Sequence, residues 1–131
     1  MSLAFEPAAG LIFVAAEVFG PEGNAVLRFA LDTGATDTLI NAAPLIALGY
    51  DLGVVSERVQ VTTGSGVEFA PRIVLKKLRS LGHERKRFPV ICHTLPPSAS
   101  IDGLLGLDFL RNHVLKIDFK KGRLTLTYRR P

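Results

Sequence analysis

The most informative stretch of this chain is Phe29-Ala30-Leu31-Asp32-Thr33-Gly34-Ala35-Thr36-Asp37-Thr38-Leu39-Ile40. In it, an acidic residue directly follows an apolar strand and opens a turn of small residues. Gly34 lets the backbone turn sharply, and Thr33 offers a hydroxyl group. An Asx-type turn at the end of a strand is common and needs no chemistry. The turn is therefore either such a structural element or a carboxylate displayed for catalysis, and its residues alone leave both open.

The segments around this turn predict an all-β protein, because turn signals recur at short intervals. Residues 11–18 and 25–31 form one expected hairpin, and residues 59–61 and 67–69 form a second. The tip of the second hairpin is the glycine-rich run Thr62-Thr63-Gly64-Ser65-Gly66. Further strands are expected, from their apolar or alternating residues, at 73–75, 88–91 and 124–128.

Two short helices are expected between these strands. Residues 42–48 follow Asn41, a candidate N-cap, carry Pro44 in their first turn and end at Gly49. Residues 107–113 have room for one or two helical turns. The expected architecture is therefore all-β and hairpin-rich, with one or two short helices.

Length and composition limit the chain to one folded unit. A chain of this size buries roughly two thirds of its surface, which suffices for one core but not for two. Apolar residues make up 47% and charged residues 21%, the balance of a globular domain rather than a disordered one. We therefore expect a single domain over residues 1–131, in which residues 1–3 are a candidate expression scar.

The charge is mildly basic and does not by itself identify a partner. The chain has 16 Lys and Arg against 12 Asp and Glu, a formal net charge of +4. The positive residues gather in 76–87 and 116–130, which solvated turns and edge strands explain better than a nucleic-acid footprint. No segment approaches the roughly 20 apolar residues of a membrane span. A membrane anchor is expected only if a native leader has been removed.

No group of residues indicates a metal or a cofactor. Cys92 is the only cysteine, so it forms no internal disulfide, and its apolar neighbours predict a buried small hydrophobe. His83, His93 and His113 lack the spacing of paired metal ligands. The glycine-rich run at 62–66 lacks the lysine and the helix that follow a phosphate-binding loop.

Three features occur in a fixed order along the chain. They are Leu31-Asp32-Thr33-Gly34-Ala35-Thr36, the hairpin tipped by residues 62–66, and Asp102-Gly103-Leu104-Leu105-Gly106 followed by Leu107-Asp108-Phe109-Leu110. In this order they resemble the retropepsin-like aspartic proteases, where they match the catalytic turn, the flap, and the strand and helix beside that turn. The last run is more similar to the bacterial and cellular branch than to the retroviral one. The resemblance covers about residues 11–127 and implies an acid-protease barrel with one lobe per chain.

The chemistry of this family needs two neighbouring carboxylates, and the chain has a single Asp-Thr-Gly. Two like charges about 3 Å apart cannot both ionise, so such a pair shares one proton. Asp37 is too far along the turn to face Asp32, and Asp102 is more simply a turn residue. A second copy on a two-fold axis is the simplest source of the other carboxylate. The resemblance implies the same homodimer.

The resemblance also implies a role for each matched residue. Asp32 is the expected catalytic carboxylate, Thr33 bonds across the two-fold axis, and Gly34 lets the backbone approach the reacting groups. An extended peptide is expected to bind between the turn and the flap. The residues expected to contact it are Ala35, Thr36, Asp37, Thr63, Gly64, Ser65, Gly66 and Leu105. The predicted function is an aspartic endopeptidase, a homodimer that hydrolyses protein or peptide substrates without a cofactor.

Two other interpretations compete with this one. An aspartyl-phosphate enzyme also carries an Asp near a Thr-Gly pair, but it needs a parallel α/β architecture that a short all-β chain lacks. A catalytically silent dimerisation or binding module of the same fold stays open, because a sequence does not separate a working site from an unused one. A statine-type inhibitor distinguishes the two, because transition-state mimics bind a working site far more tightly than substrate does.

Overall fold

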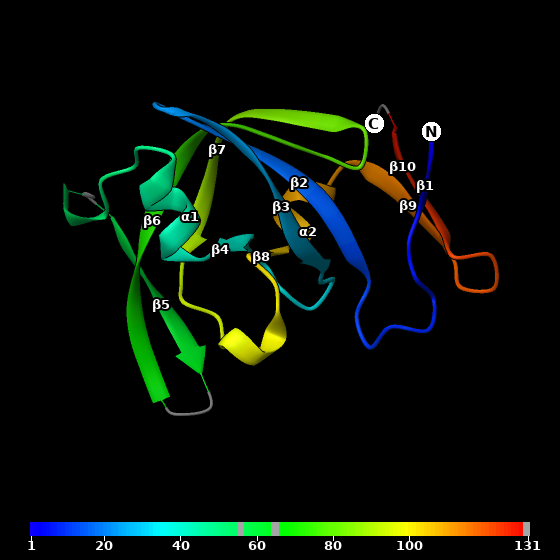
Figure 1. Ribbon diagram of the computed structural model, residues 1–131, viewed down its shortest axis with the longest axis horizontal. Coiled ribbons are helices and arrows are strands. Elements are labelled where there is room, and N and C mark those ends of the chain that lie inside the picture. Colours follow the sequence, from blue (N-terminus) through cyan, green and yellow to red (C-terminus); the bar gives the residue numbers. More distant parts are fainter. Residues whose placement is uncertain (55–56, 64–65, 130–131) are drawn as a thin grey trace.

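The computed structural model of the chain describes residues 1–54, 57–63 and 66–129, and strands dominate it (Figure 1). Within these residues it has two short α-helices, α1 and α2, as the sequence predicts. The elements follow the order β1 (Ser2–Ala4), β2 (Phe13–Gly20), β3 (Gly23–Leu31), β4 (Leu39–Ile40), α1 (Ala42–Ala47), η1 (Leu52–Val54), β5 (Arg58–Thr63), β6 (Gly66–Ser80), β7 (His83–Cys92), η2 (Pro97–Ala99), β8 (Gly103–Leu105), α2 (Leu107–Leu110), β9 (His113–Asp118) and β10 (Arg123–Tyr128).

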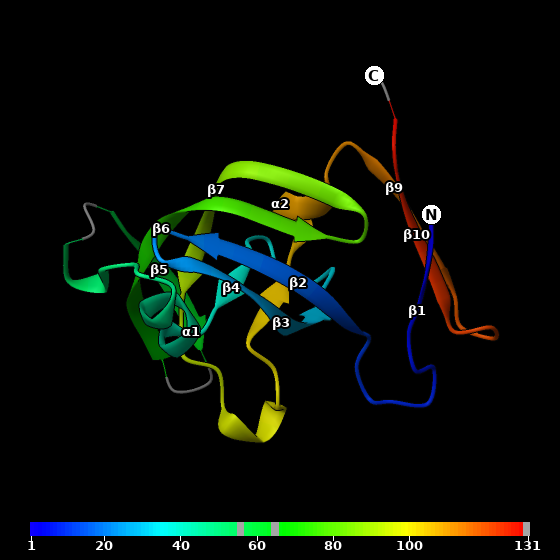
Figure 2. The ribbon, with the colours of Figure 1, turned by 45° about the horizontal axis from the view of Figure 1, so that its top comes forward.

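The larger sheet closes on itself. Its strand order is β2-β3-β8-β4-β7-β6-β5, and β2 also pairs with β6. The extra pairing makes a barrel of six strands and leaves β5 outside it, as one arm of a hairpin with β6. Figures 1 and 2 show this hairpin projecting from one side of the barrel. The fold is thus the expected retropepsin-like barrel, and closure removes most of the sheet edges.

Alternating side chains fill the barrel. In β2, Val14, Ala16 and Val18 are buried, while Ala15 between them is exposed. This period of two is what a strand with one buried face requires. The hydrophobic effect of the inward-facing residues therefore holds the strand in one register.

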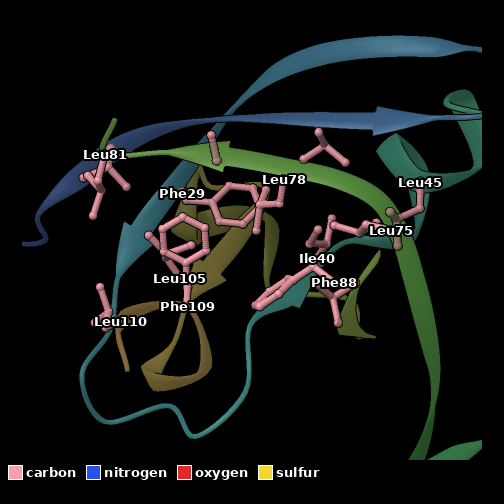
Figure 3. Close-up of a cluster of buried hydrophobic side chains, with 14 of the residues drawn as sticks. Phe29, Ile40, Leu45, Leu75, Leu78, Leu81, Phe88, Leu105, Phe109 and Leu110 are labelled. Atoms are coloured by element: carbon pink, nitrogen blue, oxygen red, sulfur yellow. The ribbon is translucent and has the colours of Figure 1, made fainter. Parts of the chain in front are cut away.

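The core reaches directly beneath the candidate site. Phe29 of β3, Leu105 of β8 and Phe109 of α2 are fully buried and belong to one cluster (Figure 3). The rings of Phe88 and Phe109 meet edge to face, with centroids 5.9 Å apart, a favoured aromatic geometry. This packing joins β3, β8 and α2, the three elements that surround Asp32.

A second, three-stranded sheet lies on the side of the molecule opposite the β5–β6 hairpin (Figures 1 and 2). Its order is β1-β10-β9, so β10 is the central strand, and Leu124 and Leu126 of that strand are buried. The first residues, a candidate scar by sequence, take part in it, since Ser2 pairs with Thr125 and Leu3 with Leu124. Among the described residues, no helix combines the length and apolar character needed to cross a membrane.

Asn41 occupies the N-cap position of helix α1, as predicted, but its side chain makes no capping hydrogen bond. Its amide instead donates to the carbonyl of Ile101 at 3.2 Å, and its side-chain oxygen accepts from the backbone of Leu95 at 2.7 Å. Asn41 therefore ties the start of the helix to the loop that precedes β8.

Strand β6 is also longer than predicted. The sequence suggested two pieces, at 67–69 and 73–75, but Gly66–Ser80 is continuous. Pro71 lies between the two pieces and pairs with Arg58, the first residue of β5. A proline is tolerated where no ladder hydrogen bond from its nitrogen is needed, so the strand runs on from hairpin to barrel.

Candidate active site

Asp32 stands at the end of β3, where the parallel neighbour β8 also ends. Leu31 pairs with Leu105, and the backbone N–H of Asp32 donates to the carbonyl of Leu105 at 2.9 Å. The Asp32 carboxylate is half-buried, and its Oδ1 accepts a hydrogen bond from the N–H of Gly34 at 2.9 Å. The strand end and its own turn therefore fix the orientation of this carboxylate.

Residues 33–38, the remainder of the turn, run from the molecular surface to the core. Thr33 and Gly34 at its start are exposed, and Thr38 at its end is fully buried. We call residues 32–38 the catalytic turn from here on, after the turn that they resemble in the retropepsin-like proteases.

The segment from β8 into α2 holds the catalytic turn from below. The N–H of Leu107 donates to the carbonyl of Ala35 at 2.8 Å, and the N–H of Asp108 donates to that of Thr36 at 3.2 Å. Gly106, directly before them, is buried against the turn, and a Cβ atom there would lie 2.8 Å from the Ala35 oxygen. Only glycine permits this approach, which explains the Gly that the sequence places after the apolar pair.

Thr38 and Asp108 form a contact to which the sequence assigned no role. The Thr38 hydroxyl lies 2.7 Å from Asp108 Oδ1 and also accepts from the N–H of Gly106 at 3.1 Å. The two residues are 70 positions apart, so no local pattern links them. The one signal in the sequence is Asp108, a single acid in the otherwise apolar run Leu107–Leu110.

The predicted substrate-contact residues fall into different environments. Thr36 is exposed, and Ala35 and Asp37 are half-buried, so all three are parts of the catalytic turn that are accessible at the surface. Leu105 is fully buried in the core cluster, and that burial does not fit the predicted contact with substrate. Its neighbour Leu104 is half-buried and, since side chains alternate along a strand, points to the opposite face.

The β5–β6 hairpin is the predicted flap. Its arms pair from Arg58 with Pro71 to Thr63 with Gly66. The predicted tip residues Gly64 and Ser65 lie outside the described residues. Thr63 and Gly66 close the described part of the hairpin by pairing with each other.

A groove of about 700 Å³ separates the base of the hairpin from the barrel. It is lined by Ala42, Leu52, Arg58, Glu68, Phe69, Ala70, Pro71, Cys92, His93, Thr94 and Pro96. Across it, His93 Nδ1 lies 3.8 Å from Glu68 Oε2. Burial raises the pKa of the Cys92 thiol at its wall, so the thiol stays neutral at ordinary pH. The groove thus keeps this part of the hairpin apart from the barrel wall.

Three histidines remain outside the candidate site. His83 and His113 stack edge to face near the second sheet, with ring centroids 4.7 Å apart, and His93 borders the groove. In the described part of the chain, no group of three or more His, Cys, Asp or Glu is placed to hold a metal ion.

Comparisons with known proteins converge on one family. The family model described as "gag-polyprotein putative aspartyl protease" matches residues 22–112, which include the catalytic turn, both arms of the hairpin and α2. Among solved structures, the chain is similar to a retropepsin-like aspartic protease from Rickettsia conorii, with 26% sequence identity and a TM-score of 0.73. That match covers 98% of this chain and 89% of the other. No curated protein matches the chain.

Proposed function

The chain belongs to the gag-polyprotein aspartyl protease family and has a retropepsin-like fold, and we propose that it is an aspartic endopeptidase whose active site is completed by a second copy of the chain. The observation that carries the proposal is the position of Asp32. It opens an Asp-Thr-Gly turn at the end of β3, and both the strand and the β8–α2 segment hold that turn. A fixed, half-buried carboxylate beside an exposed turn suits a site formed between two subunits.

The reaction needs one ionised and one protonated carboxylate. The ionised Asp32 takes a proton from a bound water, whose oxygen forms a bond to the carbonyl carbon of the scissile peptide. The protonated Asp32 of the second copy gives its proton to the carbonyl oxygen. The leaving nitrogen then takes the proton from the first Asp32, a hydroxyl of the tetrahedral intermediate gives its proton to the second Asp32, and the C–N bond breaks. No covalent intermediate with the protein forms, and each carboxylate returns to its starting protonation state.

The other predicted residues have supporting roles. Gly34 donates its N–H to Asp32 Oδ1, and the exposed Thr33 is available to bond to the second copy. An extended peptide would lie along Ala35–Asp37 of the turn and be covered by the β5–β6 hairpin, which is a common way to bind a strand-like ligand. Protein or peptide chains are thus the proposed substrates.

Mixing of subunits tests the shared site. Asp32→Asn keeps the shape of the side chain but removes the acid, so both the mutant homodimer and the mixed dimer should be nearly inactive. Equal amounts of mutant and wild type that exchange freely leave about a quarter of the dimers with two acids. Activity per chain should therefore fall to about a quarter of the wild-type value. Asp51→Asn, which removes an acid from a distant exposed turn, is the matched control and should leave the activity of the mixture unchanged.

The exchange itself must be verified, because Asn could tighten the dimer by removing carboxylate repulsion. Native mass spectrometry of isotope-labelled subunits measures the proportions of the three dimers. Random pairing together with half of the wild-type activity would mean that each chain carries a complete site. A sedimentation mass near that of one chain, with full activity, would contradict the shared site as well.

A further inference from the structure

The contact between Thr38 and Asp108 differs in kind from the other contacts of the catalytic turn. The hydrogen bonds that join Asp32, Ala35 and Thr36 to β8 and α2 connect backbone atoms, so many side chains are compatible with them. At Thr38 the partner is the Asp108 carboxylate, which accepts from both the N–H and the hydroxyl of Thr38. Few side chains can make this contact, so the identity of Thr38 and Asp108 matters for the position of the turn.

The Asp108 carboxylate accepts hydrogen bonds from three separate donors. The N–H of Thr38 lies 3.1 and 3.0 Å from its two oxygens, the Thr38 hydroxyl lies 2.7 Å from Oδ1, and the N–H of Phe109 lies 2.9 Å from Oδ1. An ionised carboxylate is an acceptor only, and it can serve all three donors at once. An amide in its place would set its own NH2 group against one of them. The donor set thus calls for Asp at position 108 rather than Asn.

Thr38 also connects Asp108 to Gly106, the residue that follows β8. Its hydroxyl donates to Asp108 and at the same time accepts from the N–H of Gly106, so both of its hydrogen-bonding functions are used. Because Thr38 is completely buried, loss of either partner would leave a polar group without water or protein to pair with. The end of the turn is therefore held in one position.

From this geometry we propose that Asp108 is a positioning residue, which through Thr38 fixes the catalytic turn and with it the Asp32 carboxylate relative to its counterpart in the second copy. Asp108 touches neither substrate nor the reacting atoms. The start of the turn is anchored at Leu105, and the end is anchored at Asp108. With the second anchor weakened, residues 33–37 can shift, and displacements of about 1 Å at a catalytic group lower rates about 100-fold. The proposal rests on the proposed peptidase function.

Four variants test it. Asp108→Asn and Thr38→Val keep the size of the side chain and remove the acid or the hydroxyl, so the protein should still fold. Thr38→Ser keeps the hydroxyl and serves as the conservative rescue. Asp51→Asn is the matched control, because Asp51 Oδ1 also accepts a backbone N–H, that of Gly53 at 2.9 Å, in a different turn.

Two readouts separate positioning from general stability. The first is the split of peptide hydrolysis into kcat and KM, with the concentration of working sites counted by a statine-type inhibitor. The second is amide hydrogen exchange of residues 32–38, measured by mass spectrometry on the intact protein. Asp108→Asn and Thr38→Val should lower kcat about 10- to 100-fold with KM within about threefold, and should speed exchange in the turn at least about tenfold. Thr38→Ser and Asp51→Asn should stay within about threefold of wild type in both readouts.

The outcomes distinguish this proposal from the one it rests on. Wild-type protein without peptidase activity contradicts the proposed function, and the exchange measurement then decides on Asp108 alone. Wild-type exchange over residues 32–38 in Asp108→Asn overturns the positioning role. So does an unchanged kcat per working site with a lower melting temperature, which is the result of a purely structural contact. A loss in Thr38→Ser as large as that in Thr38→Val also overturns it, since the hydroxyl would not be the link.

Discussion

The catalytic turn and the β5–β6 hairpin are the two halves of the proposed site, and they are held in opposite ways. The turn is bonded to β8 and α2 at both ends and in the middle, and it closes over the buried side chain of Thr38. In the described residues 58–63 and 66–71, the arms of the hairpin pair with each other, carry exposed Val67 and Phe69, and are separated at their base from the barrel by the groove. Chemistry depends on fixed geometry, whereas a cover must open for substrate. The same sheet provides both.

The strongest test of the fixed half is Gly106→Ala. The new Cβ atom would lie 2.8 Å from the Ala35 oxygen and 2.8 Å from the backbone carbon of Asp37, so the turn must move. We expect kcat/KM to fall about 100-fold or more and the free energy of unfolding to drop by about 1–3 kcal/mol. Peptide hydrolysis and thermal unfolding measure the two effects. Gly10→Ala, where the added atom meets nothing within 4 Å, is the control, and an equal loss there would refute the argument.

The support beneath the turn is tested by two neighbouring leucines. Leu105→Ala opens a cavity in the core, which should lower the free energy of unfolding by about 2–5 kcal/mol. Leu104→Ala removes a half-buried side chain from the other face and should cost clearly less, while it alters KM if that face contacts substrate. Denaturant unfolding at a fixed protein concentration compares them, because dimer stability depends on concentration. Equal losses would mean that the two faces of β8 are not distinct.

The pH dependence of hydrolysis tests whether the reaction uses the paired Asp32 carboxylates of the turn. In the proposed mechanism only the pair that shares one proton is active, so the rate should fall on both the acid and the alkaline side, by about tenfold per pH unit well outside the optimum. The two limbs belong to the pair and not to either subunit. Initial rates across the pH range provide the profile, with EDTA added in parallel. A rate that rises steadily with pH, or that EDTA abolishes, would point to a different reaction.

Cys92 lines the groove between the β5–β6 hairpin and the barrel, and the pH dependence of stability tests how strongly its thiol is buried there. Because burial raises the pKa of its thiol, the unfolded chain loses this proton first. The stabilisation is complete below about pH 8.5, the usual pKa of a free cysteine, and declines as the pH rises above that value. Denaturant unfolding of wild type and Cys92→Ala from pH 7 to pH 10 isolates this contribution. A constant difference between the two proteins over that range would contradict it.

The smallest expected effect lies in the hairpin. Glu68 and His93 are 3.8 Å apart, and the Glu68 side chain is 55% exposed, so Glu68→Gln should change the free energy of unfolding by less than about 0.5 kcal/mol. Thermal unfolding of wild type and Glu68→Gln under the same conditions measures it. A loss above about 1 kcal/mol would mean that the hairpin is anchored as firmly as the turn, and the contrast between the two regions would disappear.

Several features of this protein could be predicted from local sequence. The period of two in the strands, the short helices after Asn41 and Gly106, and the pairing of β5 with β6 all depend on residues within a few positions of one another. The Asp-Thr-Gly turn after an apolar strand, together with the Leu-Leu-Gly run much later in the chain, indicated the family. That family is confirmed by the match over residues 22–112.

Other features depend on contacts between distant residues, and only the tertiary structure decided them. Asn41 meets a start-of-helix pattern, yet its side chain bonds to Leu95 and Ile101, which the fold brings closer than its own helix N–H groups. The parallel pairing of β3 with β8 places Asp108 under Thr38 and turns Leu105 inward, and a one-residue shift of that register would reverse the faces of β8. A sequence pattern records which residues alternate. The register between strands some 70 residues apart is set by the packing of the whole core, and it decides which of those residues meet at the site.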